Sequence, residues 1–354
     1  MSDISLRPPP FLKVSSISRS TGACAVEAAA HRHAMKMQLP GGRASKCRKA
    51  HSGDVKHSEI LMARNTPAWA SGAYGDQAFR AALREIPAEP GRDRHSTERT
   101  AWARLAERLW TDIDNVETCW NRQWRRAELA RLVTVALPRA LSSDRRIRLV
   151  RDFAKEAFGS HRTAIDLVVR DRSDGNPHAF LALPTRPLDA ESWGDKDREQ
   201  WSRRRIFALR QAWQRHVNLA MEREGLRGRI DMRSRKDQGR MLESESYDRR
   251  IAARVEKAGG TAREECRAEA ARHRNQALLR ERPEIIIAEA QAELAAFTLA
   301  ELLADLAWRL DTTLLALPAS MVARVAGSSG LVPTGERTTD GLNLYVFRET
   351  GGAA

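Results

Sequence analysis

Asp166 and His178 are the residues whose types and spacing best suit chemistry. Asp166 lies in the apolar run 164–169, and His178 opens the next apolar run together with Phe180. Strand side chains two residues apart share a face, so His178 and Phe180 are predicted to point the same way. We expect hairpin pairing to place Asp166 opposite His178. An aspartate that faces a histidine can share a proton, form an ion pair or hold a divalent cation; the alternative is a histidine satisfied by a neighbour at a turn.

The surrounding elements are predicted to hold these residues in an α+β fold. Asp-Gly and Asn-Pro signals between 164–169 and 179–183 favour an antiparallel hairpin. The chain order of strand, helix, long helix, strand, helix, hairpin and helix predicts a central antiparallel sheet flanked by helices. Beyond residue 240 a mainly helical extension is expected. The predicted elements are strands at 11–18 and 132–137, helices at 21–37, 97–126, 142–158, 197–224 and 284–315, and a final strand at 342–347.

The helix at 97–126 has two interpretations because it carries four tryptophans. Trp102, Trp120 and Trp124 recur with Leu105, Leu109, Ile113 and Val116 every three or four residues, which predicts one apolar face. With Trp110 they could form a platform for stacking nucleic-acid bases. Packing of an amphipathic helix into the core is the favoured interpretation.

Composition favours a polyanionic partner. The formal net charge is +14 and the sequence pI is about 10.3, which suits nucleic acid, although solvated arginine-rich helix faces would give the same balance. The four cysteines are scattered without a CxxC pair, which argues against structural zinc and favours reduced thiols. No run approaches the length of a membrane span, so a cytoplasmic protein without membrane insertion is expected.

An ordered series of short motifs runs from about residue 132 to 239, and it resembles the MobA/MobL family of plasmid mobilisation relaxases. The resemblance extends more loosely over 11–240. We therefore predict a disordered N-terminus at 1–10, a relaxase-like domain at 11–240 and a helical extension with a flexible tail at 241–354. The motifs are Asn176-Pro177-His178, Thr185-Arg186, Arg210 to Trp213 with Asn218, Arg229-Ile230-Asp231 and Arg233-Ser234.

The resemblance implies a metal-dependent DNA strand transferase. In this family three histidines hold a divalent cation, Mg or Mn, that polarises a phosphate of single-stranded DNA at a plasmid transfer origin. A tyrosine near the N-terminus attacks that phosphate and forms a reversible covalent adduct. Other mobilisation or transfer-pore proteins are further expected partners.

Several positions of this chain depart from the family pattern. His31 stands at the tyrosine position, Phe180 at the second histidine of the Asn-Pro-His-x-His motif and Met232 at a third histidine position. Asp166 is assigned to the position of the remaining histidine. The expected metal ligands are therefore His178 and Asp166. Tyr74, in a Gly-flanked segment, is a weaker candidate nucleophile. The residues expected to contact DNA are Arg32, Lys36 and Arg186.

Three functions fit this pattern. The first is a relaxase that binds and nicks DNA at a transfer origin. The second is a non-catalytic protein of the relaxase fold that binds DNA or a partner. The third is a decayed pseudoenzyme. Loss of the tyrosine and histidines at positions 31, 166 and 180 favours the second function over an active nickase.

Overall fold

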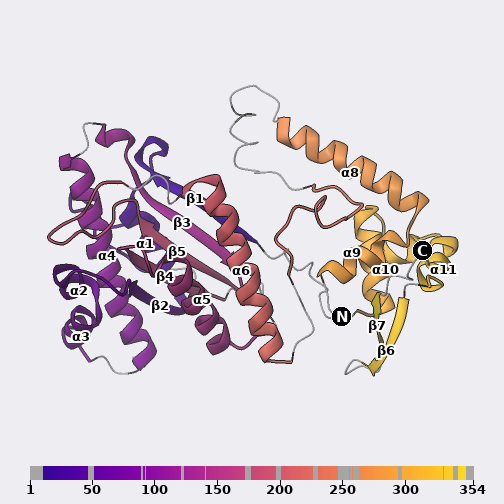
Figure 1. Ribbon diagram of the computed structural model, residues 1–354, viewed down its shortest axis with the longest axis horizontal. Helices are drawn as coiled ribbons and strands as arrows, with labels where there is room; N and C mark the ends of the chain where they lie inside the picture. The colour runs from indigo at the N-terminus through magenta and orange to yellow at the C-terminus, as the bar shows by residue number, and fades with distance from the viewer. Residues whose placement is uncertain are drawn as a thin grey trace. The chain divides into compact units, whose positions relative to one another are not determined.

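The computed structural model of the chain divides into two compact units, one of Arg7–Ala220 and one that includes Met221–Ala354 (Figure 1). The predicted disordered stretch 1–10 and Asn176 lie outside the described residues. The proposed domain limits at 240 and 241 stay a prediction. The structure describes residues 11–46, 52–88, 91, 93–120, 123–139, 141–171, 177–196, 201–225, 230–245, 255, 257, 263–293, 297–329, 331–337 and 342–347.

The first unit is built on a five-stranded antiparallel sheet in the order β1-β3-β5-β4-β2. The neighbouring strands β4 and β5 form the predicted antiparallel hairpin, which confirms both the hairpin and the α+β class. β1 and β3 confirm the strands expected at 11–18 and 132–137. The strands are β1 Leu12–Ser18, β2 Val55–Met62, β3 Glu128–Ala136, β4 Ala164–Arg170 and β5 His178–Pro184.

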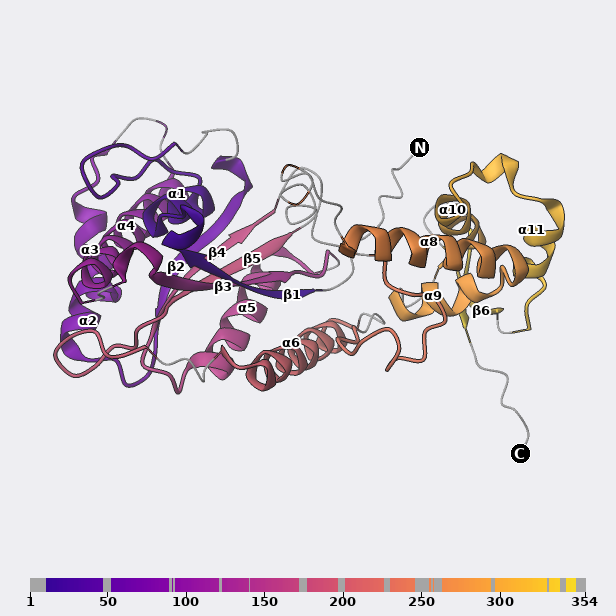
Figure 2. The same ribbon diagram turned by 90° about the horizontal axis from the view of Figure 1, so that it is seen from above.

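Helices cover both faces of this sheet (Figure 2). Helices α1 to α4 lie on one side, and α5 and α6 lie on the other. The helix predicted for 142–158 is confirmed as α5, and Ser142 caps it, because its side chain accepts a hydrogen bond from the Arg145 N–H. Gly225 follows α6 with φ +67°, a left-handed conformation that glycine adopts without strain. The helices are α1 Ala25–His33, α2 Ala68–Tyr74, α3 Asp76–Arg84, α4 Arg94–Trp120, α5 Ser143–Phe158 and α6 Arg203–Arg223.

Three helices of the first unit are shorter than expected. The helix predicted for 197–224 spans Arg203–Arg223, with 197–200 outside the described residues. The helix predicted for 21–37 ends at His33, because Ala34 turns into the left-handed region with φ +50°. The helix predicted for 97–126 ends at Trp120, and a separate 3-10 turn, Trp124–Arg126, follows. The apolar face expected for this helix is therefore wrong at its end. Trp110 is fully buried, whereas Trp120 and Trp124 are 53% and 40% exposed.

The second unit has a small core of its own, with Ile286, Phe297 and Leu306 fully buried. The single helix expected at 284–315 is wrong, because Thr298 begins a new helix through a reciprocal capping box with Glu301. None of the helices in the described ranges is long and apolar enough to cross a membrane. The elements are α8 Arg263–Glu281, α9 Ile285–Glu293, α10 Leu299–Arg309, α11 Ala319–Ala326, β6 Leu331–Arg337 and β7 Asn343–Phe347.

Candidate functional site

The register of the β4–β5 hairpin changes which residue faces His178. Asp166 pairs with Ala182, and Arg170 pairs with His178. The expected juxtaposition of Asp166 and His178 is therefore wrong. The two residues point to the same face of the sheet but stand four positions apart along the strands, about 13 Å at the usual rise per residue. The register of a hairpin depends on which residues form its turn. The apolar pattern of the two strands does not determine which residues those are.

Asp166 is instead the centre of a fully buried polar cluster beneath α1 and α4. Its Oδ2 accepts hydrogen bonds from Arg32 Nη2 at 2.6 Å and from the Trp110 indole N–H at 2.7 Å. Its Oδ1 lies 2.8 Å from His33 Nε2. Asp166 and His33 have no exposed surface, and Arg32 is 5% exposed. The carboxylate is thus saturated by protein groups.

Electrostatics keep this carboxylate ionised. Burial alone raises the pKa of Asp166, but the adjacent His33 and Arg32 outweigh burial and hold the pKa below its usual range. A buried charge is stable only when it is paired, and this cluster pairs the carboxylate on both oxygens. The consequence is mechanical: Asp166 fixes the last turn of α1 against β4.

Arg170 makes a second connection between β4 and α1, at the level of His178. Its Nη1 donates a hydrogen bond to the backbone carbonyl of His31 at 3.2 Å, and its Nη2 lies 3.3 Å from Asp54 Oδ2. The Arg170 side chain is 17% exposed. The ring of His178 packs near Phe11, with 5.2 Å between ring centroids. A guanidinium, His178 and the residue at the tyrosine position therefore meet at one end of the sheet.

These residues do not fit a divalent cation. Phe180 offers no donor atom, Arg170 brings a positive charge opposite His178, and Asp166 already has three donors. Across the described part of the chain, no group of three or more His, Cys, Asp or Glu side chains is arranged to hold a metal ion. The structure does not bring the two expected ligands, His178 and Asp166, together.

The candidate nucleophiles differ sharply in exposure. The His31 side chain is 57% exposed and lies 3.9 Å from the Glu27 carboxylate. Tyr74 belongs to α2 rather than to a loop, and it is 1% exposed with its hydroxyl donating to Asp112 Oδ2 at 2.6 Å. Burial, together with Asp112, raises the pKa of Tyr74 well above its usual range. Tyr74 is therefore held as a neutral phenol inside the core, where it cannot reach DNA.

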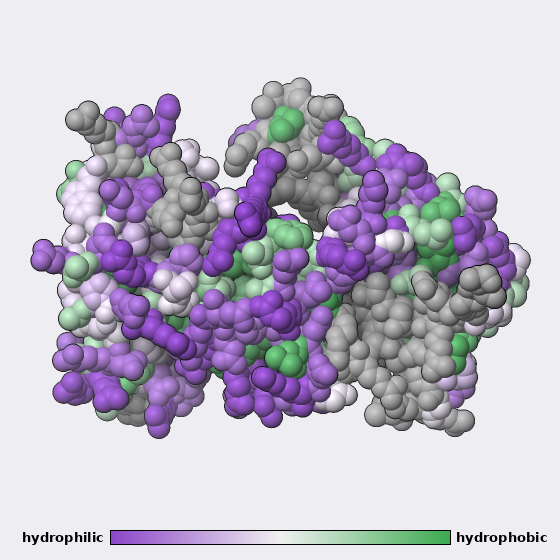
Figure 3. Space-filling view, in the orientation of Figure 1, coloured by the Kyte–Doolittle hydropathy of each residue, from purple (hydrophilic) through white to green (hydrophobic). Residues whose placement is uncertain are grey.

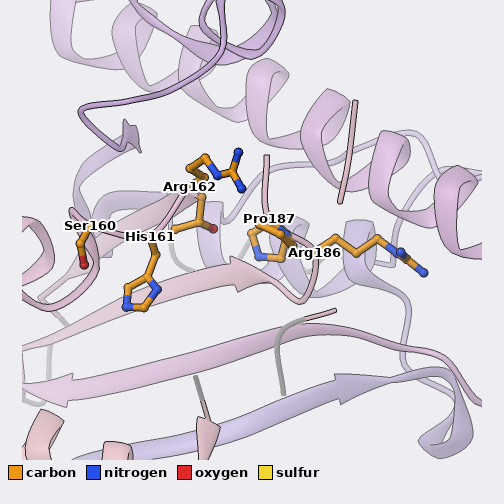
Figure 4. Close-up of a pocket in the computed structure, with 7 residues that line it drawn as sticks. Ser160, His161, Arg162, Arg186 and Pro187 are labelled. Atoms are coloured by element: carbon orange, nitrogen blue, oxygen red, sulfur yellow. The ribbon is translucent and has the colours of Figure 1, made fainter. Parts of the chain in front are cut away.

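The three residues expected to contact DNA occupy different environments. Lys36 is exposed just beyond α1, whereas Arg32 is buried in the Asp166 cluster. Arg186 is 7% exposed, and its guanidinium donates to Glu117 at 2.6 Å and to the Gly194 carbonyl at 3.0 Å. It borders a cavity of about 240 Å³ at the far end of β5, but its guanidinium points away from the cavity residue His161 (Figure 4).

Arg170 and His33 were not predicted as site residues, and Trp110 was considered only as a member of a possible base-stacking platform. No local motif marks them, because each owes its place to a partner on another element. A weak signal existed for Arg170, since it ends the apolar run that precedes the turn and is the strand residue nearest to His178 in sequence.

The chain belongs to the MobA/MobL family, which it matches over residues 23–257. It is 28% identical over 187 residues to a probable conjugal transfer protein TraA of Sinorhizobium fredii, covering 53% of this chain and 14% of that protein. It is 27% identical over 254 residues to a conjugal transfer protein TraA of Rhizobium radiobacter, covering 64% of this chain and 20% of that protein. The chain thus spans a fifth or less of the length of these two relatives.

A shorter sequence match and two solved structures are also similar to this chain. Mobilization protein A of Escherichia coli is 29% identical over 148 residues, covering 37% of this chain and 20% of that protein. A structure described as "Molecular Basis of Vancomycin Resistance Transfer in Staphylococcus aureus" is similar with a TM-score of 0.48 and 19% identity, over 64% of this chain and all of that one. A metal-bound structure of the conjugative relaxase TrwC in complex with oriT DNA is similar with a TM-score of 0.36 and 13% identity. The match covers 77% of this chain and 98% of that one.

Proposed function

We propose that this chain binds single-stranded DNA of a plasmid transfer origin without cutting it. Arg170 and His178 would hold a phosphate where the family resemblance implies a divalent cation. Membership of the MobA/MobL family and the conjugal transfer and mobilisation roles of its relatives support the DNA partner. The net charge of +14 supports binding to a polyanion. The observation that carries the proposal is the pairing of Arg170 with His178 across the hairpin.

An arginine can take over the attraction for phosphate without supplying the chemistry of a metal. Its planar guanidinium stays charged and carries five N–H donors that match phosphate oxygens. Two of the Arg170 nitrogens contact His31 and Asp54, which orients the group. Because Nε is buried, a ligand would bind through the second N–H of Nη1 or Nη2. Binding therefore survives the substitution of the metal ligands, whereas strand cleavage loses both its metal and its tyrosine.

Binding to a 20-nucleotide single strand is expected to weaken with salt and to be unaffected by EDTA or Mn²⁺. Each phosphate contact contributes a slope of about −0.7 to log K against log salt for single strands. Arg170→Gln should weaken binding and make that slope shallower by about 0.7. Fluorescence anisotropy across a salt series measures both effects, with circular dichroism to verify folding.

Arg80→Gln on α3 is the matched control, because Arg80 is exposed and lies away from the hairpin. It should leave the slope within error of the parent protein. A nicked plasmid or a covalent DNA adduct formed with Mn²⁺ would overturn the non-cutting proposal. Binding without any salt dependence would contradict recognition through phosphates.

A further inference from the structure

Two tryptophans at the end of α4 lie on the surface rather than in the core. Trp120 is 53% exposed and Trp124 is 40% exposed, whereas Trp110 and Trp213 of the same unit are fully buried. Phe207 on α6 is a further exposed aromatic side chain, at 51%. Trp120 is the last residue of α4, and Trp124 begins the 3-10 turn η3 that leads into β3. We infer that Trp120 and Trp124, the tryptophan platform, stack the bases of single-stranded DNA.

Arginines lie against both indoles of the tryptophan platform. The Arg186 guanidinium carbon is 5.5 Å from the centroid of the Trp120 ring, and Arg19 and Arg125 are 5.4 and 5.1 Å from that of Trp124. Arg19 is itself held by Asp114 at 2.7 Å and by the Trp124 carbonyl at 3.2 Å. Cation–π contacts of this kind hold an aromatic ring in place, so less entropy is lost when a base stacks on it.

The charge around the tryptophan platform favours an anionic partner. The carboxylates of Asp114, Glu117 and Glu128 are all paired with arginines or a lysine of the same region. Arg125 and Arg126 are exposed and have no ion pair with any described residue. Apolar rings beside unneutralised guanidinium groups match the two chemical parts of a nucleic acid, its bases and its phosphates. In the face that Figure 3 displays, hydrophilic residues gather over the lower part of this unit, with hydrophobic residues among them.

The partner must be single-stranded, because stacking on a side chain needs a base face that is free of its neighbours. The tryptophan platform stands at the start of β3, and Arg170 and His178 lie level with its end, since Ala136 pairs with His178. The nine residues of β3 separate the two regions by roughly 25 to 30 Å. This inference rests on the proposed function and adds a second contact region to it.

The tryptophan platform is tested by combining tryptophan substitutions in the protein with removal of the bases from the DNA. Trp120→Ala and Trp124→Ala are each expected to weaken binding to a 20-nucleotide oligothymidine by about fivefold or more, because base stacking on an aromatic contributes about 1 to 3 kcal/mol. The slope against salt should stay unchanged, since no phosphate contact is lost. On an oligonucleotide of the same length with abasic sites throughout, the same substitutions should have no effect.

The control variant is Trp308→Ala, because Trp308 is 54% exposed but belongs to the second unit. It should bind both oligonucleotides as the parent protein does. If the parent protein binds oligothymidine and both Trp→Ala variants bind it as tightly as the parent does, the tryptophan platform is overturned and the proposed function stands. Parent protein that binds no single strand overturns both. Equal losses on normal and abasic DNA would show that the tryptophans act on folding or on phosphate contacts, which also overturns stacking.

Discussion

Replacing Asp166 by alanine is expected to lower the melting temperature of the first unit by about 6 to 20 °C. The substitution leaves Arg32 and His33 buried without their shared carboxylate, and removing one partner of a buried ion pair costs about 3 to 5 kcal/mol. A domain of this size loses roughly 2 to 4 °C per kcal/mol. Arg32 is poorly compensated even in the parent, since its Nε and Nη1 have no hydrogen-bond partner in the described structure. Differential scanning calorimetry of the full chain measures the change.

Asp152→Ala is the control for this effect, because Asp152 is exposed on α5 of the same unit. It should shift the melting temperature by no more than about 2 °C, as surface substitutions usually do. An Asp166→Ala protein that melts as the parent does would show that the buried cluster contributes nothing to stability. Loss of the Asp166 contacts should also loosen α1 and so weaken the Arg170–His31 contact.

The pH dependence of stability gives a second measure of the same cluster. The folded pKa of Asp166 is lowered, and the unfolded pKa is about 3.9. The stabilisation is therefore fully present above the unfolded pKa and is lost as the pH falls below about 4 toward the folded pKa. The melting temperature of the parent should fall more steeply between pH 5 and pH 3 than that of Asp166→Ala. Parallel curves would contradict the ionised state of this carboxylate.

The sequence pattern predicts those parts of the fold that local forces determine. The β4–β5 hairpin follows from two apolar runs around an Asp-Gly and Asn-Pro turn, and α5 follows from its Ser142 cap and periodic apolar face. In the second unit, a helix-start motif in the sequence was not used in predicting the helices. Thr298 and Glu301 have the spacing of a capping box, which marks the start of α10 inside the run predicted as one helix.

The features that were mispredicted depend on where an element ends. A strand pattern of period two tells which face a residue shares, and both Asp166 and His178 were placed on a common face. It does not tell where the turn closes, and a shift of four positions exchanged Asp166 for Arg170 opposite His178. Likewise, helical periodicity cannot show that α4 ends at Trp120, so Trp124 was placed on a face that does not continue.

Histidines placed at positions 170 and 180, which the register puts beside His178, are expected to create a metal site. Arg170→His with Phe180→His, beside the native His178, gives three imidazoles on one face of two paired strands. Directly opposed residues on such strands have Cβ atoms about 4.5 to 5.5 Å apart, and two residues along one strand share that face. Imidazole is a good ligand for Zn²⁺ and binds other divalent transition metals. Zn²⁺ at about 100 times its dissociation constant should then stabilise the double variant by about 2.7 kcal/mol, or roughly 5 to 10 °C in a thermal melt.

The comparison variants separate the register from a mere increase in histidine content. Phe180→His alone keeps the Arg170 charge opposite His178 and should gain little from Zn²⁺, because the cation would have to approach a guanidinium. Adding His178→Ala to the double variant should remove the gain. If the single variant responds to Zn²⁺ as strongly as the double variant, then residue 170 does not occupy the third ligand position. In that case Arg170 would not stand at the position of a metal ligand, and its guanidinium could not be said to replace the metal. Asp166 would still be excluded as the third metal ligand, because its carboxylate already accepts from three buried groups.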